Sequence, residues 1–407
     1  MKYINWYFST YKGLSKEIWI MATTLLINRS GLMVMTFLSL YLIEAFDYSK
    51  AEAGFVVSFY GWGSIFGVWL GGFLAEKVGY LRIQILAMLV SGLVFISMYF
   101  CSEYFQFILL TFLVSATADT FRPANMASVP WFSSEENRTR SIALIRLAIN
   151  LGISIGPAVG GFLAITLGYA SLFWVDGITC IAAGIFMFSF LGIKDPNIRN
   201  GSNKELASEE IETVSSELIT NEPDKASPKF WWLVISIFFW SFAFFQIIYG
   251  FTVFMKEDLL FDEFTIGLFY TLNGLIIFFI EMPVVQVLQK KKTVPILNVG
   301  IVLCAISFIF LFLGTPQLLL FPIGYILFIT FGEIFYLPFT NTLALNYTPE
   351  KSRAKYMSYY SLAFSISHVL GPLLGLWLAD KYGFQTLWVL CSLVMIVVFI
   401  MTQKLKD

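Results

Sequence analysis

Charged side chains inside long apolar segments are the residues of this sequence best suited to chemistry. The seven that fall in predicted membrane-spanning helices are Arg29, Asp119, Arg122, Arg146, Asp176, Glu281 and Glu333. An ionised side chain at the centre of a bilayer costs about 3 kcal/mol on insertion scales, so such residues normally face one another or a wet cavity. A row of charges along a water-filled interior is typical of a transporter.

Two of these carboxylates are candidates for coupling transport to protons, because a carboxyl group changes protonation when its surroundings change. Glu333 has apolar and aromatic neighbours and no basic residue within one turn. It is either a coupling or substrate residue, or a protonated side chain bonded to a neighbouring helix. Asp119 and Arg122 are three residues apart on one helical face, where they can pair. The pair is either a structural salt bridge or one that opens when Asp119 is protonated.

The other polar candidates also allow more than one interpretation. Arg29 either holds an anionic group of the substrate or neutralises a carboxylate across a cavity. His368 is the single histidine, and it is either a satisfied packing residue or part of a proton relay. We expect Arg146 to extend its guanidinium to the cytoplasmic face. We expect Glu281 to cap broken backbone or to pair with a lysine.

The composition indicates a membrane protein. Of 407 residues, 58% are hydrophobic and 13% charged, and the mean hydropathy is +0.76; a soluble domain has about 25% charged residues. The net charge of −1 gives no reason to expect a nucleic-acid partner. The four cysteines lie in or beside apolar runs without CxxC spacing, which predicts core thiols and no metal site.

Twelve apolar runs are long enough to span a bilayer, which takes about 20 residues. They are Glu17–Ile43, Ala53–Ala75, Ile83–Phe100, Phe105–Ala127, Ile142–Ile165, Leu172–Ile193, Phe230–Phe254, Phe264–Leu288, Val294–Leu313, Leu318–Leu343, Met357–Ala379 and Leu387–Met401. The sequence therefore predicts an all-α membrane protein with twelve transmembrane helices.

Lysine and arginine positions predict the orientation, since these residues favour cytoplasmic loops. With both termini cytoplasmic, 20 of the 26 Lys and Arg residues are cytoplasmic and 3 lie in outer loops. The segment 194–228 is rich in Glu, Ser, Asn and Lys, a composition that cannot bury a core. We expect it to be a cytoplasmic linker, with a surface helix at 205–217, between six-helix halves at 1–193 and 229–407.

The two halves repeat at an offset of 215 residues, between 122–174 and 337–389. The matches include Pro123 with Pro338, Glu135 with Glu350, Gly156-Pro157 with Gly371-Pro372, and Gly160 with Gly375. A parallel repeat of two six-helix halves is an architecture of secondary transporters, whose substrate site lies between the halves near the bilayer midplane.

Two motifs resemble the major facilitator superfamily, and within it the twelve-helix drug:proton antiporters. After the second span, Gly72-Phe-Leu-Ala-Glu76-Lys77-Val-Gly79-Tyr80-Leu81-Arg82 resembles G-x-L-A-D-R-x-G-R-K, with Glu in place of the usual Asp. The fifth span contains Gly152-Ile-Ser-Ile-Gly156-Pro157-Ala-Val-Gly160-Gly161, which resembles the antiport motif of that branch. Arg122 in the fourth span and Glu333 in the tenth also occupy positions where the family places an Arg and a cavity-facing Glu.

The resemblance implies proton-coupled export of small amphipathic compounds by alternating access. It implies that Glu76 and Lys77 form a latch to the adjacent half-bundle; the alternative is that they are ordinary loop charges. The small residues of the fifth and eleventh spans are expected to allow tight packing between halves that rock. They are Gly152, Gly156, Pro157 and Gly160, with Gly371, Pro372 and Gly375. We expect a monomer in the cytoplasmic (inner) membrane that uses no cofactor.

The alternative is a proton-coupled uptake symporter for a nutrient such as a peptide, sugar or siderophore, with Arg29 on an anionic group. An enzyme is not expected, because the sequence contains no GxSxG element, no phosphate-binding Gly-Lys loop and one histidine. The partners expected are therefore a small-molecule substrate, protons and the lipid bilayer.

Overall fold

The computed structural model of the protein describes residues 13–192, 225–349 and 353–405. Within these ranges it consists of helices without a strand, and twelve helical stretches are long and apolar enough to cross a membrane. The predicted fold class is thus confirmed. Most of the predicted linker 194–228, including the expected helix at 205–217, lies outside the described residues.

The first six spans are formed by seven helices. These are α2 (Lys16–Ser30), α3 (Val34–Phe46), α4 (Lys50–Val78), α5 (Tyr80–Met98), α6 (Tyr104–Phe132), α7 (Glu135–Leu167) and α8 (Ser171–Leu191). Polar caps begin the apolar helices: Ser15 accepts the Ile18 N–H, and Ser49 forms a capping box with Glu52. Such caps satisfy backbone N–H groups that a helix start leaves without partners.

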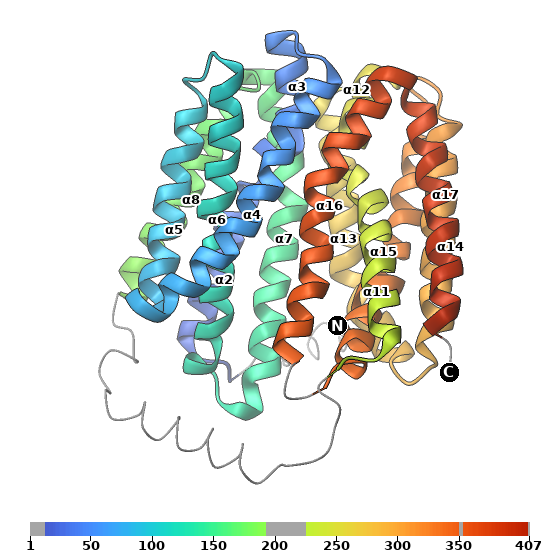
Figure 1. The fold of residues 1–407 in the computed structure, drawn as a ribbon. Coiled ribbons are helices and arrows are strands. Elements are labelled where there is room, and N and C mark those ends of the chain that lie inside the picture. Colours follow the sequence, from blue (N-terminus) through green and yellow to red (C-terminus); the bar gives the residue numbers. More distant parts are fainter. Residues whose placement is uncertain (1–12, 193–224, 350–352, 406–407) are drawn as a thin grey trace, which may run out of the picture.

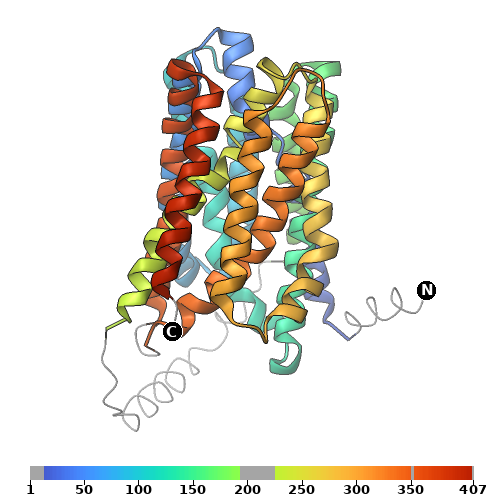
Figure 2. The ribbon, with the colours of Figure 1, turned by 90° about the vertical axis from the view of Figure 1, so that its right-hand side faces the viewer.

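The last six spans are formed by α11 (Pro228–Phe244), the 3-10 turn η1 (Phe245–Ile247), α12 (Gly250–Glu257), α13 (Glu263–Leu288), α14 (Thr293–Phe312), α15 (Leu320–Asn346), α16 (Arg353–Tyr382) and α17 (Phe384–Thr402), followed by the 3-10 turn η2 (Gln403–Leu405). In Figure 1 the first six spans (blue to green) lie on the left and the last six (yellow to red) on the right. The helices follow roughly one common direction in both views (Figure 1, Figure 2).

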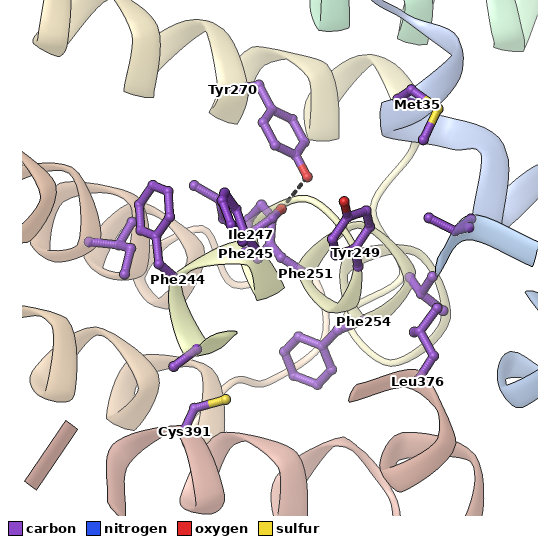
Figure 3. Packing of buried hydrophobic residues seen from close by; sticks show 14 of the residues in the cluster. Met35, Phe244, Phe245, Ile247, Tyr249, Phe251, Phe254, Tyr270, Leu376 and Cys391 are labelled. Atoms are coloured by element: carbon purple, nitrogen blue, oxygen red, sulfur yellow. Dashed lines mark hydrogen bonds between the residues drawn. The ribbon is translucent and has the colours of Figure 1, made fainter. Parts of the chain in front are cut away.

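Spans 1 and 7 are each interrupted near the middle, which the sequence analysis did not predict. The first break lies between Ser30 and Val34, and the second contains η1 and ends at Gly250. The offset of the repeat relates them, since residues 31–33 correspond to 246–248. At the second break the hydroxyl of Tyr270 donates a hydrogen bond to the Ile247 carbonyl (Figure 3).

Asp176 satisfies the backbone at the first break. Its carboxylate is fully buried and accepts the N–H of Met33 at 3.1 Å and that of Val34 at 2.8 Å. Both donors belong to the start of α3, where a negative charge also meets the positive end of the helix macrodipole. The intramembrane carboxylate of α8 therefore has a structural role, as the cap of a helix 143 residues away in the chain.

The glycine stripe of α7 packs against this break. A Cβ at Gly152 would lie 2.7 Å from the Arg29 Cβ, and one at Gly160 would lie 2.8 Å from the Met33 Cβ. A Cβ at Gly156 would lie 3.2 Å from the Ser30 carbonyl oxygen. The three glycines pack closely, but against the first span of their own group of six, whereas packing between the halves was expected. In α7 the contact with the last six spans is made by the neighbouring Pro157 and Gly161.

The repeated glycines of α16 have the corresponding place at the second break. The Gly371 carbonyl accepts a hydrogen bond of 3.0 Å from the Gln246 amide. A Cβ at Gly375 would overlap the same glutamine side chain. The repeat seen in the sequence thus places a small-residue stripe against a broken span in both groups.

Two pairs of helices make most of the contact between the first six spans and the last six. The first pair is α4 and α16, which run side by side in Figure 1; a Cβ at Gly54 would lie 2.5 Å from the Pro372 carbonyl oxygen. The second pair is α7 and α13, where a Cβ at Gly267 would overlap the Pro157 carbonyl oxygen. Backbone-to-backbone contact of this kind needs small residues at both helices.

A polar network joins the two groups at what we call the distal end, opposite the linker end at which α8 ends and α11 begins. Lys50 at the start of α4 pairs with Glu257 at 2.7 Å, and the Tyr169 hydroxyl donates to the Glu263 carboxylate. Glu263 also holds Lys256 at 2.6 Å. Burial, together with the nearby Glu263, raises the pKa of Tyr169, which keeps it a donor. We call these five residues the distal network.

Candidate functional site between the two groups of spans

The predicted pairing of Asp119 with Arg122 is confirmed in α6. The Arg122 Nε lies 2.8 Å from the Asp119 Oδ1, and the side chains are 55% and 1% exposed, respectively. Pro123 follows directly, and because proline has no N–H, the Asp119 carbonyl lacks its usual intrahelical donor. The buried carboxylate therefore has a cationic partner that is itself accessible, at a locally weakened point of the helix.

His368 lies on the opposite side, in α16. Its Nδ1 is 2.9 Å from the Tyr249 hydroxyl, and its ring lies over the Phe245 ring with centroids 3.7 Å apart. A Cβ at Gly61 of α4 would lie 2.8 Å from the His368 carbonyl carbon, so this histidine borders the first six spans. Asp119 lies within electrostatic range of its imidazole. A packed histidine and a relay residue both fit this position.

Arg29 occupies the last turn of α2, immediately before the first break. Its Nε is buried without a hydrogen-bond partner, and the described residues provide no ion pair for it. Gly152 contacts its stem, and the Cys180 thiol lies within electrostatic range. Among the described residues no carboxylate across the interface neutralises Arg29.

Two tyrosines that the sequence analysis did not select connect these groups. Tyr60 of α4 is an electrostatic neighbour of Arg29, Asp119 and Arg122, and it is also one of Tyr249 on the other side. The only available signal for Tyr60 was its place beside Gly61 in a glycine-rich span. We call the following six residues the central cluster: Arg29, Tyr60, Asp119, Arg122, Tyr249 and His368.

Glu333 belongs to a separate group. On α15, its carboxyl has Asn273 within hydrogen-bonding range and Glu281 as an electrostatic neighbour, both from α13. Glu281 in turn pairs with Arg146 of α7 at 2.9 Å. This pair corrects two expectations: the Arg146 guanidinium binds a carboxylate of the other group, and the partner of Glu281 is an arginine, where a lysine or a backbone cap was expected.

The motif after the second span is described in part. Gly79 adopts φ +105°, a conformation that favours glycine, and it ends α4. Lys77 places its Nζ 4.0 Å from the centre of a phenylalanine ring, and Gly72 has open space around its Cβ position. The Arg82 Nε is buried without a hydrogen-bond partner. The side chain of Glu76 lies outside the described part, so the latch stays a prediction.

The described residues contain no group of three His, Cys, Asp or Glu side chains that could hold a metal ion. All four cysteines are buried as free thiols. What the site offers is a set of charged and hydroxyl side chains, from both groups of spans, that can exchange ion pairs and hydrogen bonds.

Twelve membrane-crossing helices in two repeat-related groups, with a polar cluster between them, are the architecture of a secondary transporter. The chain belongs to the Major Facilitator Superfamily, whose family model matches residues 18–349 and 328–405. It is a multi-pass membrane protein.

The chain is similar to curated relatives of this family. The Bacillus subtilis (strain 168) protein described as an uncharacterized MFS-type transporter, YttB, is 24% identical over 376 residues, covering 91% of this chain and 89% of the relative. The multidrug resistance protein MdtG of Salmonella typhimurium (strain LT2) is 26% identical over 173 residues, covering 42% of this chain and 41% of the relative.

Solved structures show the same fold. A POT family transporter in complex with 5-aminolevulinic acid has a TM-score of 0.77 at 14% identity, with 97% of this chain and 98% of that chain covered. A bacterial homolog of the human lysosomal transporter Spinster has a TM-score of 0.76 at 14% identity, with 95% of each chain covered. At these identities the likeness concerns the fold alone.

Proposed function

We propose that this transporter exports small amphipathic compounds in exchange for protons. The observation that carries the proposal is the central Asp119–Arg122 pair, a buried carboxylate held at 2.8 Å by an arginine that stays accessible. Protonation of Asp119 removes the charge that holds Arg122, which then interacts with other groups between the spans. A carboxyl group of this kind can report the proton gradient to the rest of the site.

Two further observations support export over uptake. The partial similarity is to a multidrug resistance protein, and the fifth span contains the glycine–proline element that resembles the antiport motif. The glycines of this element pack against the broken first span at Arg29 and Met33. A change at the central cluster therefore has a direct mechanical path into α7, which contacts the last six spans.

We further propose that the residues 1–193 and 229–407 move as two units around this cluster, joined by the linker 194–228. The distribution of lysine and arginine supports placing both termini in the cytoplasm. The similarity to a bacterial transporter supports the inner membrane as its location. The distal network then lies at the outer face. A single chain contains a complete central cluster, which supports a monomer as the working unit.

The test is proton flux in proteoliposomes that contain purified protein and a trapped pH-sensitive dye. Cationic, neutral and anionic amphipathic compounds are added to the wild type, to Asp119→Asn and to Glu333→Gln. The matched control is Lys381→Gln, which removes a charge near the end of α16, where its Nζ lies 5.4 Å from the centre of the Trp377 ring. We expect proton movement opposite to the substrate, abolished in Asp119→Asn and retained in Lys381→Gln.

Each outcome separates the candidates. Loss in Glu333→Gln with retention in Asp119→Asn would transfer the coupling role to the Glu333 group. Proton movement in the same direction as the substrate would refute export and establish the uptake symporter. Substrate movement without any proton movement would refute proton coupling.

A further inference from the structure

We propose that the substrate has an anionic group, a carboxylate, and that Arg29 binds it. This inference deepens the proposed function and rests on it in one respect only: the central cluster is taken as the substrate site. It selects anionic or zwitterionic amphiphiles from the wider class of amphipathic compounds, and it excludes simple lipophilic cations as the preferred ligands.

The first step is the charge balance of the spans. Arg122 is neutralised by Asp119 and Arg146 by Glu281, at 2.8 and 2.9 Å. Arg29 is the remaining arginine of the predicted intramembrane set, and the described residues give it no such partner. Near the middle of the first span, an unpaired guanidinium needs water or an anion from outside the chain.

The second step excludes the two carboxylates that are still available. The Asp176 carboxylate already accepts hydrogen bonds from the backbone N–H groups of Met33 and Val34 at the start of α3. Glu333 has Asn273 and Glu281 as its neighbours on α13. The carbonyl end of α2 offers Arg29 only the partial charge of a helix terminus, about half an elementary charge. The central cluster thus has one positive charge in excess when the Asp119–Arg122 pair is closed.

The third step concerns the side chains that surround Arg29. Tyr60 lies within electrostatic range of Arg29 on one side and of Tyr249 on the other. Beyond Tyr249, the ring of Phe245 lies over His368. A carboxylate at Arg29 would therefore have the Tyr60 phenol within electrostatic range, and the aromatic surface for an apolar body lies further along. Arginine is well suited to this task, because its planar fork binds carboxylates through two hydrogen bonds.

The experiment compares matched ligands on the purified, full-length protein in detergent, without a proton gradient. The probes are benzoate, 2-naphthoate and decanoate, each beside its primary amide, with 2-naphthylmethylammonium as the cation. Dissociation constants are measured by calorimetry for the wild type, Arg29→Gln, Arg29→Lys and the control Lys381→Gln. Size-exclusion profiles and helical content establish that each variant is folded.

We expect the wild type and Lys381→Gln to bind at least one carboxylate about tenfold or more tightly than its amide, as charge-assisted hydrogen bonds of a partly buried arginine predict. Arg29→Gln should bring the two constants of that pair together, and Arg29→Lys should keep part of the difference. If Arg29→Gln does not fold, the test is the comparison of the wild type with Arg29→Lys. The preference for the carboxylate over its amide should then be smaller in Arg29→Lys than in the wild type.

Three results would overturn the proposal: equal constants or no binding for every carboxylate and amide in the wild type, tighter binding of the ammonium probe, or a carboxylate preference that survives in Arg29→Gln. Failure of the proposed function looks different. A carboxylate preference that depends on Arg29, without proton movement in proteoliposomes, would refute proton exchange and leave the Arg29 site standing.

Discussion

Tyr169 offers a direct test of how the distal end is held closed. Its hydroxyl donates to Glu263, which belongs to the last six spans, so Tyr169→Phe removes one bond between the two groups and keeps the ring. Glu263 retains Lys256 at 2.6 Å, so its carboxylate is not left without a partner. A hydrogen bond to a charged group contributes about 1.5–3 kcal/mol. The lower value corresponds to about a twelvefold increase in the open population.

The assay uses a reporter cysteine, Leu376→Cys, in the interface itself. Leu376 is fully buried in α16, and its Cβ lies next to the backbone of Gly54 in α4. The four native thiols are buried, which keeps background labelling low. While opening is rare and fast, the labelling rate with a membrane-impermeant maleimide follows the open population. We therefore expect Tyr169→Phe to raise this rate about tenfold over the reporter alone.

A second variant tests whether the change in labelling rate follows the strength of the interaction that is removed. Lys50 pairs with Glu257 at 2.7 Å, but these side chains are 25% and 27% exposed, so the pair is weakened by solvent. Lys50→Met should then raise labelling about two- to fivefold, in line with 0.5–1 kcal/mol for such pairs. Lys381→Met removes a charge outside the distal network and should leave the rate unchanged. Unchanged labelling in Tyr169→Phe, or equal increases in all three variants, would refute the reasoning.

Three further predictions follow from the packing and the caps. Asp176→Ala leaves the buried Val34 N–H without an acceptor and the Met33 N–H with the Gly31 carbonyl alone, so thermal unfolding in detergent should begin several degrees lower; about 1–3 kcal/mol is expected. Gly267→Ala pushes α13 away from the Pro157 carbonyl and should lower transport and raise Leu376→Cys labelling, whereas Gly72→Ala, with open space at its Cβ, should change neither. Arg146→Gln leaves Glu281 without its partner and should destabilise the protein more than Lys381→Gln, as measured by the melting temperature.

The twelve spans were predictable because their signal is local. Each is a run of apolar residues long enough to cross a bilayer, and no long-range information is needed to find it. The pairing of Asp119 with Arg122 was predictable for the same reason, since three residues separate them on one helix. The close packing of Gly152, Gly156 and Gly160 also followed from spacing, although the spacing does not tell which neighbour a glycine stripe meets.

Features that depend on partners far along the chain were not predictable. Asp176 caps a helix that starts 142 residues earlier in the chain, and Arg146 forms an ion pair with Glu281, which lies 135 residues later. The breaks in spans 1 and 7 interrupt apolar runs without a proline, so hydropathy alone counts each as one helix. Gly267 and Gly274 offered a weak signal, two small residues seven apart on one helical face. Only the fold reveals that this face meets α7.

The broken first span also changes what can be transmitted through the membrane. An intact helix behaves as a rod, so a displacement at one end appears at the other. Here α3 is bonded to α8 through Asp176, whereas α2, which ends at Ser30, packs against the glycines of α7 and also contacts α8 through Asn28 and Cys180. A displacement of Arg29 is therefore passed sideways into α7 and α8, and it does not continue along one unbroken helix into α3.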